Sequence, residues 1–227
     1  GWSRAQAESV HRKNAAKIKR EILRLKGLFI KVGQMLSIMS NFLPEPFRAE
    51  LEGLQDAVPP HPYEAVETRF RQEFGKKPDE LFREFDRRPI ASASLGQVHT
   101  AVLPDGTKAA VKVQYPEIEQ VVRIDLKTLR RIFSLLHLFF PLYGLKRVYG
   151  EISEVIRHEL DYVYEGKNLE TLRRNFEGEK DFLFPDLFWD YSTERILTLQ
   201  FMEGVKISDL KRLEKNQVNP REIATKI

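Results

Sequence analysis

A lysine stands in the middle of an apolar segment of the chain. Lys112 is the fourth residue of AAVKV, residues 109–113, which follows a Pro-Asp-Gly turn. Burying an unpaired ammonium group among such neighbours is costly. We therefore expect either that Lys112 faces solvent at a sheet edge or that a carboxylate pairs with it. A strand lysine held by a helix glutamate can bind nucleotide phosphates, so the second alternative predicts a phosphate site.

A run of small residues lies one predicted strand before this lysine. It comprises Ala91, Ser92, Ala93, Ser94, Leu95, Gly96, Gln97 and Val98. Small side chains let backbone N–H groups approach a phosphate, and such turns form anion-binding concavities. Alanine and serine make a stiffer loop than the glycines usual at such sites. An ordinary hairpin is the alternative, and the loop together with Lys112 is more specific for phosphate than either feature alone.

Acidic residues gather further along the chain, between residues 159 and 168. If this segment is one straight helix, Asp161, Glu165 and Asn168 lie on one stripe while Glu159 points nearly the opposite way. One carboxylate is then free to pair with Lys112 while another contacts something else. Without the preceding strands, the segment would be an ordinary solvated acidic face.

A fourth segment, KVGQ at residues 31–34, falls inside an N-terminal helical pattern. Lys31 and Gln34 are three residues apart and are neighbours on a helix surface. Gly33 costs a helix roughly 1 kcal/mol relative to alanine, which suggests close packing against another element. The alternative is a surface lysine and glutamine without a functional role.

The composition fits a folded globular chain and excludes thiol chemistry. Of the 227 residues, 42% are hydrophobic and 31% are charged, and there is no cysteine, which excludes disulfides and thiolate metal ligands. The five histidines show no metal-ligand spacing, so no metal site is predicted. Residues 1–31 hold nine Lys or Arg against two Glu, which favours either an anionic membrane surface or a solvated helix face. Nucleic-acid binding is not predicted, because no aromatic platform accompanies this charge.

The apolar stretch over residues 132–142 is too short to span a bilayer. Residues 1–31 are too polar for a signal peptide. We therefore expect a cytoplasmic location without a transmembrane segment in this chain, either free or peripheral at a membrane. No pattern bears on the oligomeric state.

Periodicity predicts helices followed by a sheet. Apolar residues at steps of four and three from Ile18 to Met39 predict one long helix from about Arg4 to Ser40. Further helices are expected from residue 47, over 63–74 with a stop at Gly75, and over 79–85, so that the first 86 residues are helical. The remaining predicted elements are strands at 89–94, 97–103 and 108–114, helices at 117–140 and 148–176, strands at 187–191 and 195–201, and helices beginning at 209 and 220.

These motifs, in this order, resemble the ABC1/ADCK/UbiB family of atypical kinase-like proteins over about residues 20–210. KVGQ at 31–34 matches the KxGQ signature, and ASAS at 91–94 matches the alanine-rich AAAS loop, with Ser92 in place of its second alanine. Lys112 matches the strand lysine, Glu159-Leu160-Asp161 matches the ExD motif, and STERILT at 192–198 matches the strand before the hinge.

The resemblance implies an α+β fold. It consists of a protein-kinase-like small lobe, with a five-stranded antiparallel sheet and a C helix, preceded by an all-helical KxGQ extension. The expected division is the extension at 1–86, the kinase-like lobe with inserted helices at 87–203, and the start of a second lobe at 204–227.

The resemblance also implies a nucleotide site for ATP or ADP with Mg²⁺. The small-residue loop and Lys112 would hold the phosphates, and Glu165 would pair with Lys112; these two are the expected catalytic residues. Leu199 would be the gatekeeper, and the hinge facing adenine would be Gln200, which replaces a usual glutamate, with Phe201 and Met202. The expected regulatory residues are Lys31, Gly33, Gln34, Glu159 and Asp161, with Lys31 near one of the two acids and Gln34 turned towards the pocket.

Family members support ubiquinone or other isoprenoid-quinone lipid metabolism, often at a membrane, and suit ATP hydrolysis better than protein phosphorylation. The catalytic-loop Asp, the metal-binding Asn and the D-F-G aspartate do not occur up to Ile227. The chain is then either a fragment of a longer protein, which we favour, or a naturally truncated relative. In both cases we expect that it does not turn over ATP by itself. The competing interpretation is a non-catalytic kinase-like scaffold that binds lipid or a protein partner.

Overall fold

The computed structural model describes residues 4–25, 45, 49, 60–93, 95–139, 145–207, 209–216, 218 and 219. In chain order the elements are α1 (Arg4–Leu25), α4 (Tyr63–Phe74), α5 (Pro78–Leu81), β1 (Glu84–Phe85), β2 (Ala91–Ser92), β3 (Gly96–Val102), β4 (Lys108–Gln114), α6 (Ile118–Phe139), α7 (Leu145–Glu159), α8 (Tyr162–Asn175), the 3-10 turn η1 (Trp189–Tyr191), β5 (Ile196–Gln200) and α9 (Leu210–Lys215).

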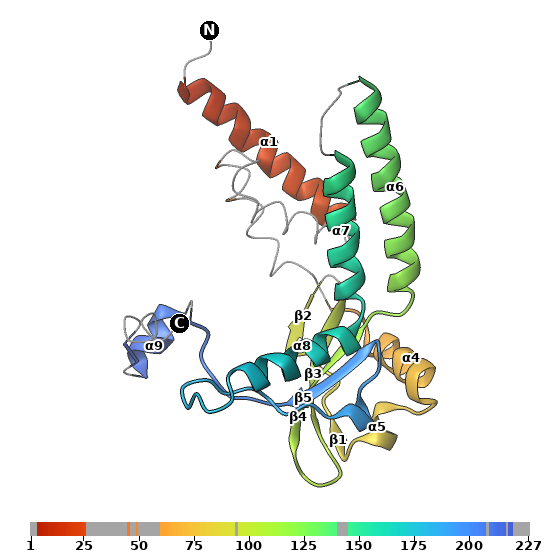
Figure 1. Cartoon of the computed structure of the whole chain (residues 1–227), viewed down its shortest axis with the longest axis vertical. Helices are drawn as coiled ribbons and strands as arrows, with labels where there is room; N and C mark the ends of the chain where they lie inside the picture. Colours follow the sequence, from red (N-terminus) through yellow and green to blue (C-terminus); the bar gives the residue numbers. More distant parts are fainter. Residues whose placement is uncertain are drawn as a thin grey trace.

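An antiparallel sheet lies at the centre of the lobe (Figure 1). Its strand order is β1-β3-β4-β5, and β2 pairs with the same strand β3, so that all five strands are antiparallel to their neighbours. This confirms the predicted α+β fold with a five-stranded antiparallel sheet. Helices α6 and α7 are connected in sequence and run side by side away from the sheet (Figure 1).

Burial alternates along the central strands. Val111 and Val113 of β4 are 0% and 1% exposed, whereas Ala110 and Lys112, which alternate with them, are half-exposed. Because successive side chains of a strand point to opposite faces, the sheet has one buried face and one half-exposed face. Lys112 lies on the half-exposed face, and the hydrophobic residues of the buried face meet α4.

Helix α4 covers the buried face because its apolar residues recur every four positions. Val66 and Phe70 are 2% and 0% exposed, and the Phe70 ring lies 5.6 Å from that of Phe85 in β1. The helix ends at Gly75, whose φ of 68° is left-handed and favours glycine. The predicted helix over 63–74 with its stop at Gly75 is confirmed.

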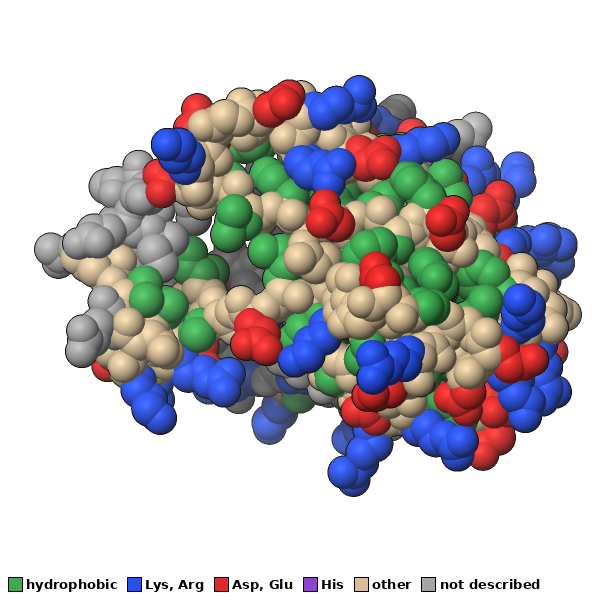
Figure 2. All heavy atoms as spheres, turned by 90° about the horizontal axis from the view of Figure 1, so that it is seen from below, with side chains coloured by type: hydrophobic (Ala, Val, Ile, Leu, Met, Phe, Trp, Pro, Cys, Tyr) green, Lys and Arg blue, Asp and Glu red, His purple; other side chains and the backbone are tan. Residues whose placement is uncertain are grey.

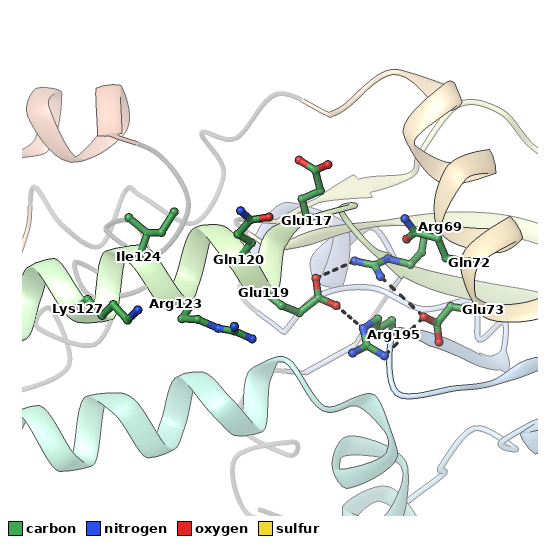
Figure 3. Close-up of a pocket in the computed structure, with 10 residues that line it drawn as sticks. All are labelled: Arg69, Gln72, Glu73, Glu117, Glu119, Gln120, Arg123, Ile124, Lys127 and Arg195. Carbon is green, nitrogen blue, oxygen red and sulfur yellow. Dashed lines mark hydrogen bonds and ion pairs between the residues drawn. The ribbon is translucent and has the colours of Figure 1, made fainter.

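Two arginines and two glutamates connect α4, α6 and the start of β5 (Figure 3). Arg69 donates to Glu119 at 3.1 Å, and Arg195 donates to the other oxygen of the same carboxylate. Glu73 lies 3.8 Å from Arg69 and 3.6 Å from Arg195. Burial raises the pKa of Glu119, but hydrogen bonds from its backbone, Arg195 and Arg69 outweigh this and lower its pKa overall. The carboxylate therefore stays charged between the two guanidinium groups.

Arg69 also fixes the end of β4. It is 4% exposed, and it donates to the backbone carbonyls of Gln114 at 3.2 Å and Tyr115 at 2.7 Å. Beside this network lies a cavity of about 640 Å³, also lined by Glu117, Arg123 and Lys127. None of the residues predicted to contact a nucleotide lines this cavity.

A chain of hydrogen bonds runs through the buried face. The His61 N–H donates to Gln97 Oε1 at 2.9 Å, the Gln97 amide lies 3.0 Å from His99 Nε2, and His99 Nδ1 lies 2.7 Å from the Asp86 carbonyl. Since Gln97 Oε1 accepts, its NH₂ donates to Nε2, and Nδ1–H donates to Asp86. His99 is 0% exposed; burial lowers its pKa against the opposing effect of Asp86. The imidazole is therefore neutral.

Two predicted elements are wrong in the helical parts of the chain. Helix α5 ends at Leu81, and residues 84–85 form β1 instead of the end of a helix over 79–85, because Phe85 enters the core and pairs with β3. The predicted helix over 148–176 is two helices, α7 and α8, separated at residues 160–161. The first 86 residues are thus not entirely helical; the division of the chain at residue 86 stays a prediction.

The other elements agree more closely with their patterns. The hairpin of β3 and β4 is confirmed, and Asp209 caps α9 as predicted by accepting from the Arg212 N–H at 3.1 Å. The predicted strand over 187–191 reduces to a single bridge between Leu187 and Leu199, followed by η1. The predicted helices over residues 26–40, from 47 and from 220 lie outside the described residues.

On the face seen from below Figure 1, acidic and basic side chains are interspersed around hydrophobic ones (Figure 2). In the described part of the chain, no helix combines the length and the apolarity that crossing a membrane requires.

Replacing Arg69 should test the network that fixes α4 to the sheet. We expect Arg69→Gln to lower the free energy of unfolding by about 3 kcal/mol, because it leaves two buried backbone carbonyls without their donor and removes one of the two guanidinium groups that bind Glu119. Arg71→Gln on the same helix is the matched control and should change stability by less than about 0.5 kcal/mol, because Arg71 is 57% exposed. Urea unfolding measures both; equal effects would contradict the account.

Lowering the pH should test the neutral state of His99. Below the ordinary histidine pKa of about 6.5, His99 gains a proton in the unfolded chain but stays neutral in the folded chain. Protonation therefore favours the unfolded chain, and the free energy of unfolding decreases as the pH falls. We expect His99→Gln to be less stable than wild type near pH 7.5, with a gap that narrows near pH 5.5. A constant gap for His99→Gln would contradict the assignment.

Candidate functional site

Lys112 is paired with a carboxylate on the half-exposed face of the sheet. Its Nζ lies 2.9 Å from Glu165 Oε1 and 2.6 Å from Glu165 Oε2, so the ion pair predicted from the sequence is present across 53 positions of chain. The side chains are 31% and 43% exposed, which leaves the ammonium group accessible from one side. The Lys112 Nζ also lies 4.5 Å from the centre of the Tyr162 ring, a favourable place for a cation.

The break between α7 and α8 sets the position of Glu165. The Leu160 carbonyl accepts from Gln114 Nε2 at 2.8 Å, and the Asp161 carboxylate caps α8 by accepting from the Tyr164 N–H at 3.1 Å. A side-chain cap of this kind begins a new helix. Glu165 therefore lies in the first turn of α8 and faces β4, where Lys112 stands.

Gly166 allows α8 to approach η1 and β5. A side-chain carbon at this position would lie 2.8 Å from the Trp189 ring and 3.0 Å from Leu187. Trp189 Nε1 donates to Glu170 at 2.8 Å, which fixes the middle of α8 to η1. The small residue next to Glu165 thus permits the close helix approach that the ion pair needs.

Tyr162 forms the buried wall beside the ion pair. It is 2% exposed, and its N–H donates to the Glu194 carbonyl at 2.9 Å. Burial, followed by the nearby carboxylates of Glu165 and Glu159, raises the pKa of its phenol well above the ordinary value. Tyr162 therefore remains neutral, and the face of its ring makes a favourable cation–π contact with the Lys112 ammonium group. Tyr162 was not predicted as a site residue, although an aromatic residue so close to Glu165 was a usable signal.

The small-residue loop joins β2 to β3. Ala91 pairs with Val98 and Ser92 with Gln97, and the Ala93 N–H donates to the Gly96 carbonyl at 2.8 Å. At Gly96 a side-chain carbon would lie 2.4 Å from the Val113 carbonyl oxygen, so only glycine fits there. Ser94 lies outside the described residues.

Apolar residues surround Lys112 on the half-exposed face. Val98 of β3 and Leu197 of β5 stand directly opposite Lys112, and Leu199 stands opposite Ala110. Val98, Ala110 and Leu199 are each half-exposed. The expected gatekeeper and two residues flanking Lys112 thus form one accessible apolar surface next to a cation.

The expected hinge continues from this surface. The Phe201 N–H donates to the Lys108 carbonyl at 3.0 Å and therefore continues the ladder with β4. The Gln200 N–H donates to the Asp186 carbonyl at 2.8 Å. Met202 is 44% exposed, and its backbone takes part in no hydrogen bond with the backbone of another described residue. Of the three hinge residues, Met202 is the one whose N–H group does not donate to the neighbouring backbone among the described residues.

Three predictions for the site need correction or stay open. Gln97 is 1% exposed and bonds to His61 and His99, so its side chain faces away from Lys112 and only its backbone can line the site. Asp161 is the cap of α8 rather than a member of its stripe.

The segment predicted to lie beside Glu159 and Asp161 contains Lys31, Gly33 and Gln34, which lie outside the described residues. The contact of Lys31 with Glu159 or Asp161 stays a prediction, as does the orientation of Gln34 towards the pocket. The nucleotide-binding roles of the site residues also stay predictions.

Comparison with known proteins supports the resemblance. The chain matches the ABC1 atypical kinase-like domain over residues 53–227. It is 38% identical to a probable serine/threonine-protein kinase of Dictyostelium discoideum over 87% of this chain and 30% of that protein. It is 36% identical to the chloroplastic ACTIVITY OF BC1 COMPLEX KINASE 7 of Arabidopsis thaliana over 100% of this chain and 33% of that protein. The chain thus spans about a third of the length of these relatives.

A solved structure has a similar fold. It is the complex of Rv3197 with erythromycin from Mycobacterium tuberculosis, with a TM-score of 0.62 and 33% sequence identity over 91% of this chain and 52% of that chain. The Lys112–Glu165 pair, the five-stranded sheet and the family match over residues 53–227 agree with one another. The chain belongs to the ABC1 atypical kinase-like family.

Proposed function

We propose that the half-exposed face of the sheet binds an adenine nucleotide, ATP or ADP. The observation that carries this proposal is the Lys112–Glu165 pair, whose ammonium group is oriented by both carboxylate oxygens and remains partly exposed. A lysine held in this way presents its charge to phosphate without the cost of an unpaired buried cation. The kinase-like family of the chain supports the same assignment.

The residues around Lys112 fit such a ligand. Val98, Ala110 and Leu199 offer an apolar surface for a base, and the Met202 backbone lies at the edge where a hinge would contact adenine. The backbone of the small-residue loop would line the phosphates, since Gly96 keeps the loop close to β4. The groups expected to hold Mg²⁺ belong to motifs that do not occur in this sequence.

We further propose that this chain by itself binds nucleotide without turnover, and that a complete protein of this type is a kinase or ATPase. Bound ATP would supply the phosphoryl group, while Lys112 would orient the phosphates. The resemblance to the ABC1/ADCK/UbiB family supports a role in ubiquinone or other isoprenoid-quinone lipid metabolism. The regulatory KxGQ and ExD residues would act on this same nucleotide site.

Replacing Lys112 should test the nucleotide site. We expect Lys112→Met to weaken ADP binding by roughly 10- to 100-fold, because a charge-assisted hydrogen bond to phosphate is worth about 1.5–3 kcal/mol. Isothermal titration calorimetry on the chain measures the affinity. Lys167→Met is the matched control, because Lys167 is an exposed lysine on α8 and should bind ADP as wild type does.

Two results would contradict the proposal. If the wild-type chain binds neither ADP nor ATP, the half-exposed face of the sheet is not a nucleotide-binding site. Equal affinity of wild type and Lys112→Met would show that nucleotide binds elsewhere.

We also propose that α1 contacts an anionic membrane surface. Lys13, Lys17, Arg20 and Arg24 follow one another at steps of four, three and four and therefore share one face of the helix. All four are exposed, whereas Ala15 on the opposite side is 1% exposed. Ile18, the first residue of the apolar stripe that runs to Met39, is 44% exposed, so the start of this stripe is only partly buried. A basic face of this kind gains about 1 kcal/mol per residue near anionic lipid.

Vesicle binding should test the basic face of α1. We expect the chain to co-sediment with vesicles containing phosphatidylserine, to a degree that rises with the anionic fraction and falls with salt. Changing Lys13, Lys17, Arg20 and Arg24 to Gln should abolish binding. A control with the same number of charges removed at exposed positions changes Lys76, Arg88, Lys167 and Lys180 to Gln. Equal loss in both variants, or no binding by wild type, would contradict the proposal.

A further inference from the structure

Tyr115 contacts the small-residue loop with its hydroxyl group. The residue directly follows β4 and is 4% exposed. Its Oη lies 3.0 Å from Ser92 Oγ and 3.3 Å from the Ala93 carbonyl oxygen. A phenol has one proton to donate, and the Ala93 carbonyl can only accept. Ser92 therefore donates to Tyr115, which donates to Ala93, so that one hydroxyl group holds two successive residues of the loop.

The backbone and the ring of Tyr115 are fixed independently of the loop. Its carbonyl accepts from Arg69 at 2.7 Å, and its side chain belongs to the core that Leu95, Ile118 and Ile156 form between the loop and the helices α6 and α7. The ring also stacks on His61, with ring centres 3.7 Å apart and planes at 11°. Tyr115 is therefore a rigid anchor, against which the loop is positioned.

The anchor acts on the loop rather than on the sheet as a whole. The Tyr115 N–H donates to the Leu95 carbonyl at 3.1 Å, and the Ala93 N–H is occupied by Gly96 within the loop. Burial raises the pKa of Tyr115, with an opposing effect of the Ser92 hydrogen bond, so the hydroxyl group remains a donor at neutral pH. Ser92 stands where the family's loop has alanine, and an alanine has no hydroxyl group to complete this contact.

We infer that Tyr115 is a positioning residue that holds the small-residue loop in its phosphate-binding shape before a nucleotide arrives. The inference rests on the proposed function, because it assigns the loop to nucleotide phosphates. A loop that is already ordered loses less conformational freedom when the ligand binds. Removal of the hydroxyl group should therefore weaken binding of the phosphates and leave binding of the nucleoside unchanged.

The test compares Tyr115→Phe and Ser92→Ala with wild type and with Tyr164→Phe. Tyr164 is the matched control, because its ring also stacks on a histidine, His158, with centres 4.1 Å apart, and none of the hydrogen bonds given for the described residues uses its hydroxyl group. Hydrogen exchange of the amides at 90–98 is measured without ligand, relative to the amides of α4 in the same sample. Affinities for ADP and for adenosine are then measured by calorimetry or NMR titration.

We expect faster exchange at 90–98 in Tyr115→Phe and Ser92→Ala, and wild-type exchange in Tyr164→Phe. ADP should bind about fivefold more weakly to Tyr115→Phe, with adenosine affinity unchanged. The lost hydroxyl group makes two hydrogen bonds, to Ser92 and Ala93, and the expected effect on binding is on the scale of one net hydrogen bond. The double variant should bind ADP no more weakly than Tyr115→Phe, because Tyr115→Phe already removes the contact that Ser92→Ala removes.

Unchanged exchange at 90–98 in Tyr115→Phe would overturn the inference whether or not nucleotide binds. Equal weakening of ADP and adenosine would also overturn it, because a general loss of structure would then explain the effect. If wild type binds neither compound, the proposed function fails and the phosphate role of Tyr115 fails with it, whereas altered exchange would still establish the anchor itself.

Discussion

A lysine in an apolar strand needs a carboxylate partner, and this requirement organises the lobe. Lys112 stands among valines and alanines, so its charge would be costly without Glu165. The partner must come from a helix that lies close to the sheet. Gly166 permits that approach, the Asp161 cap begins the helix one turn before Glu165, and the Tyr162 ring lies beside the ammonium group. Each of these features is local, and together they place one cation at an accessible apolar surface.

The buried face of the sheet supplies the rigidity that this arrangement needs. Helix α4 packs its phenylalanines on that face, and Arg69 connects it to the end of β4 and to α6. The same arginine fixes Tyr115, whose hydroxyl group holds the small-residue loop. The helix before the sheet therefore influences the half-exposed face indirectly, through the end of β4 and the loop, without contacting a ligand itself.

Local patterns predicted the parts of the fold that depend on neighbouring residues. The hairpin of β3 and β4 and the stop at Gly75 follow from turn chemistry and periodicity, and the partner of Lys112 followed from the family's motifs. The break at residues 160–161 did not follow from periodicity, because the helical pattern continues across it. The Asp161 cap is a local feature, but the Leu160 carbonyl at the break is bound by the Gln114 side chain, 46 positions away in the chain. The burial of Gln97 was predictable from its alternation with Val98 in β3. The role of Tyr115 was not predictable from the sequence, because it depends on which loop the Tyr115 hydroxyl group contacts in the folded chain.

We propose above all that nucleotide binds on the Lys112 face of the sheet. Titrating ¹⁵N-labelled chain with ADP and Mg²⁺ tests it most directly, because backbone amide shifts locate the ligand residue by residue. We expect the largest shifts at Val98, Ala110, Lys112 and Met202, with small shifts in α4. Shifts centred instead on Arg123 and Lys127, around the cavity of about 640 Å³ beside the arginine network, would contradict it.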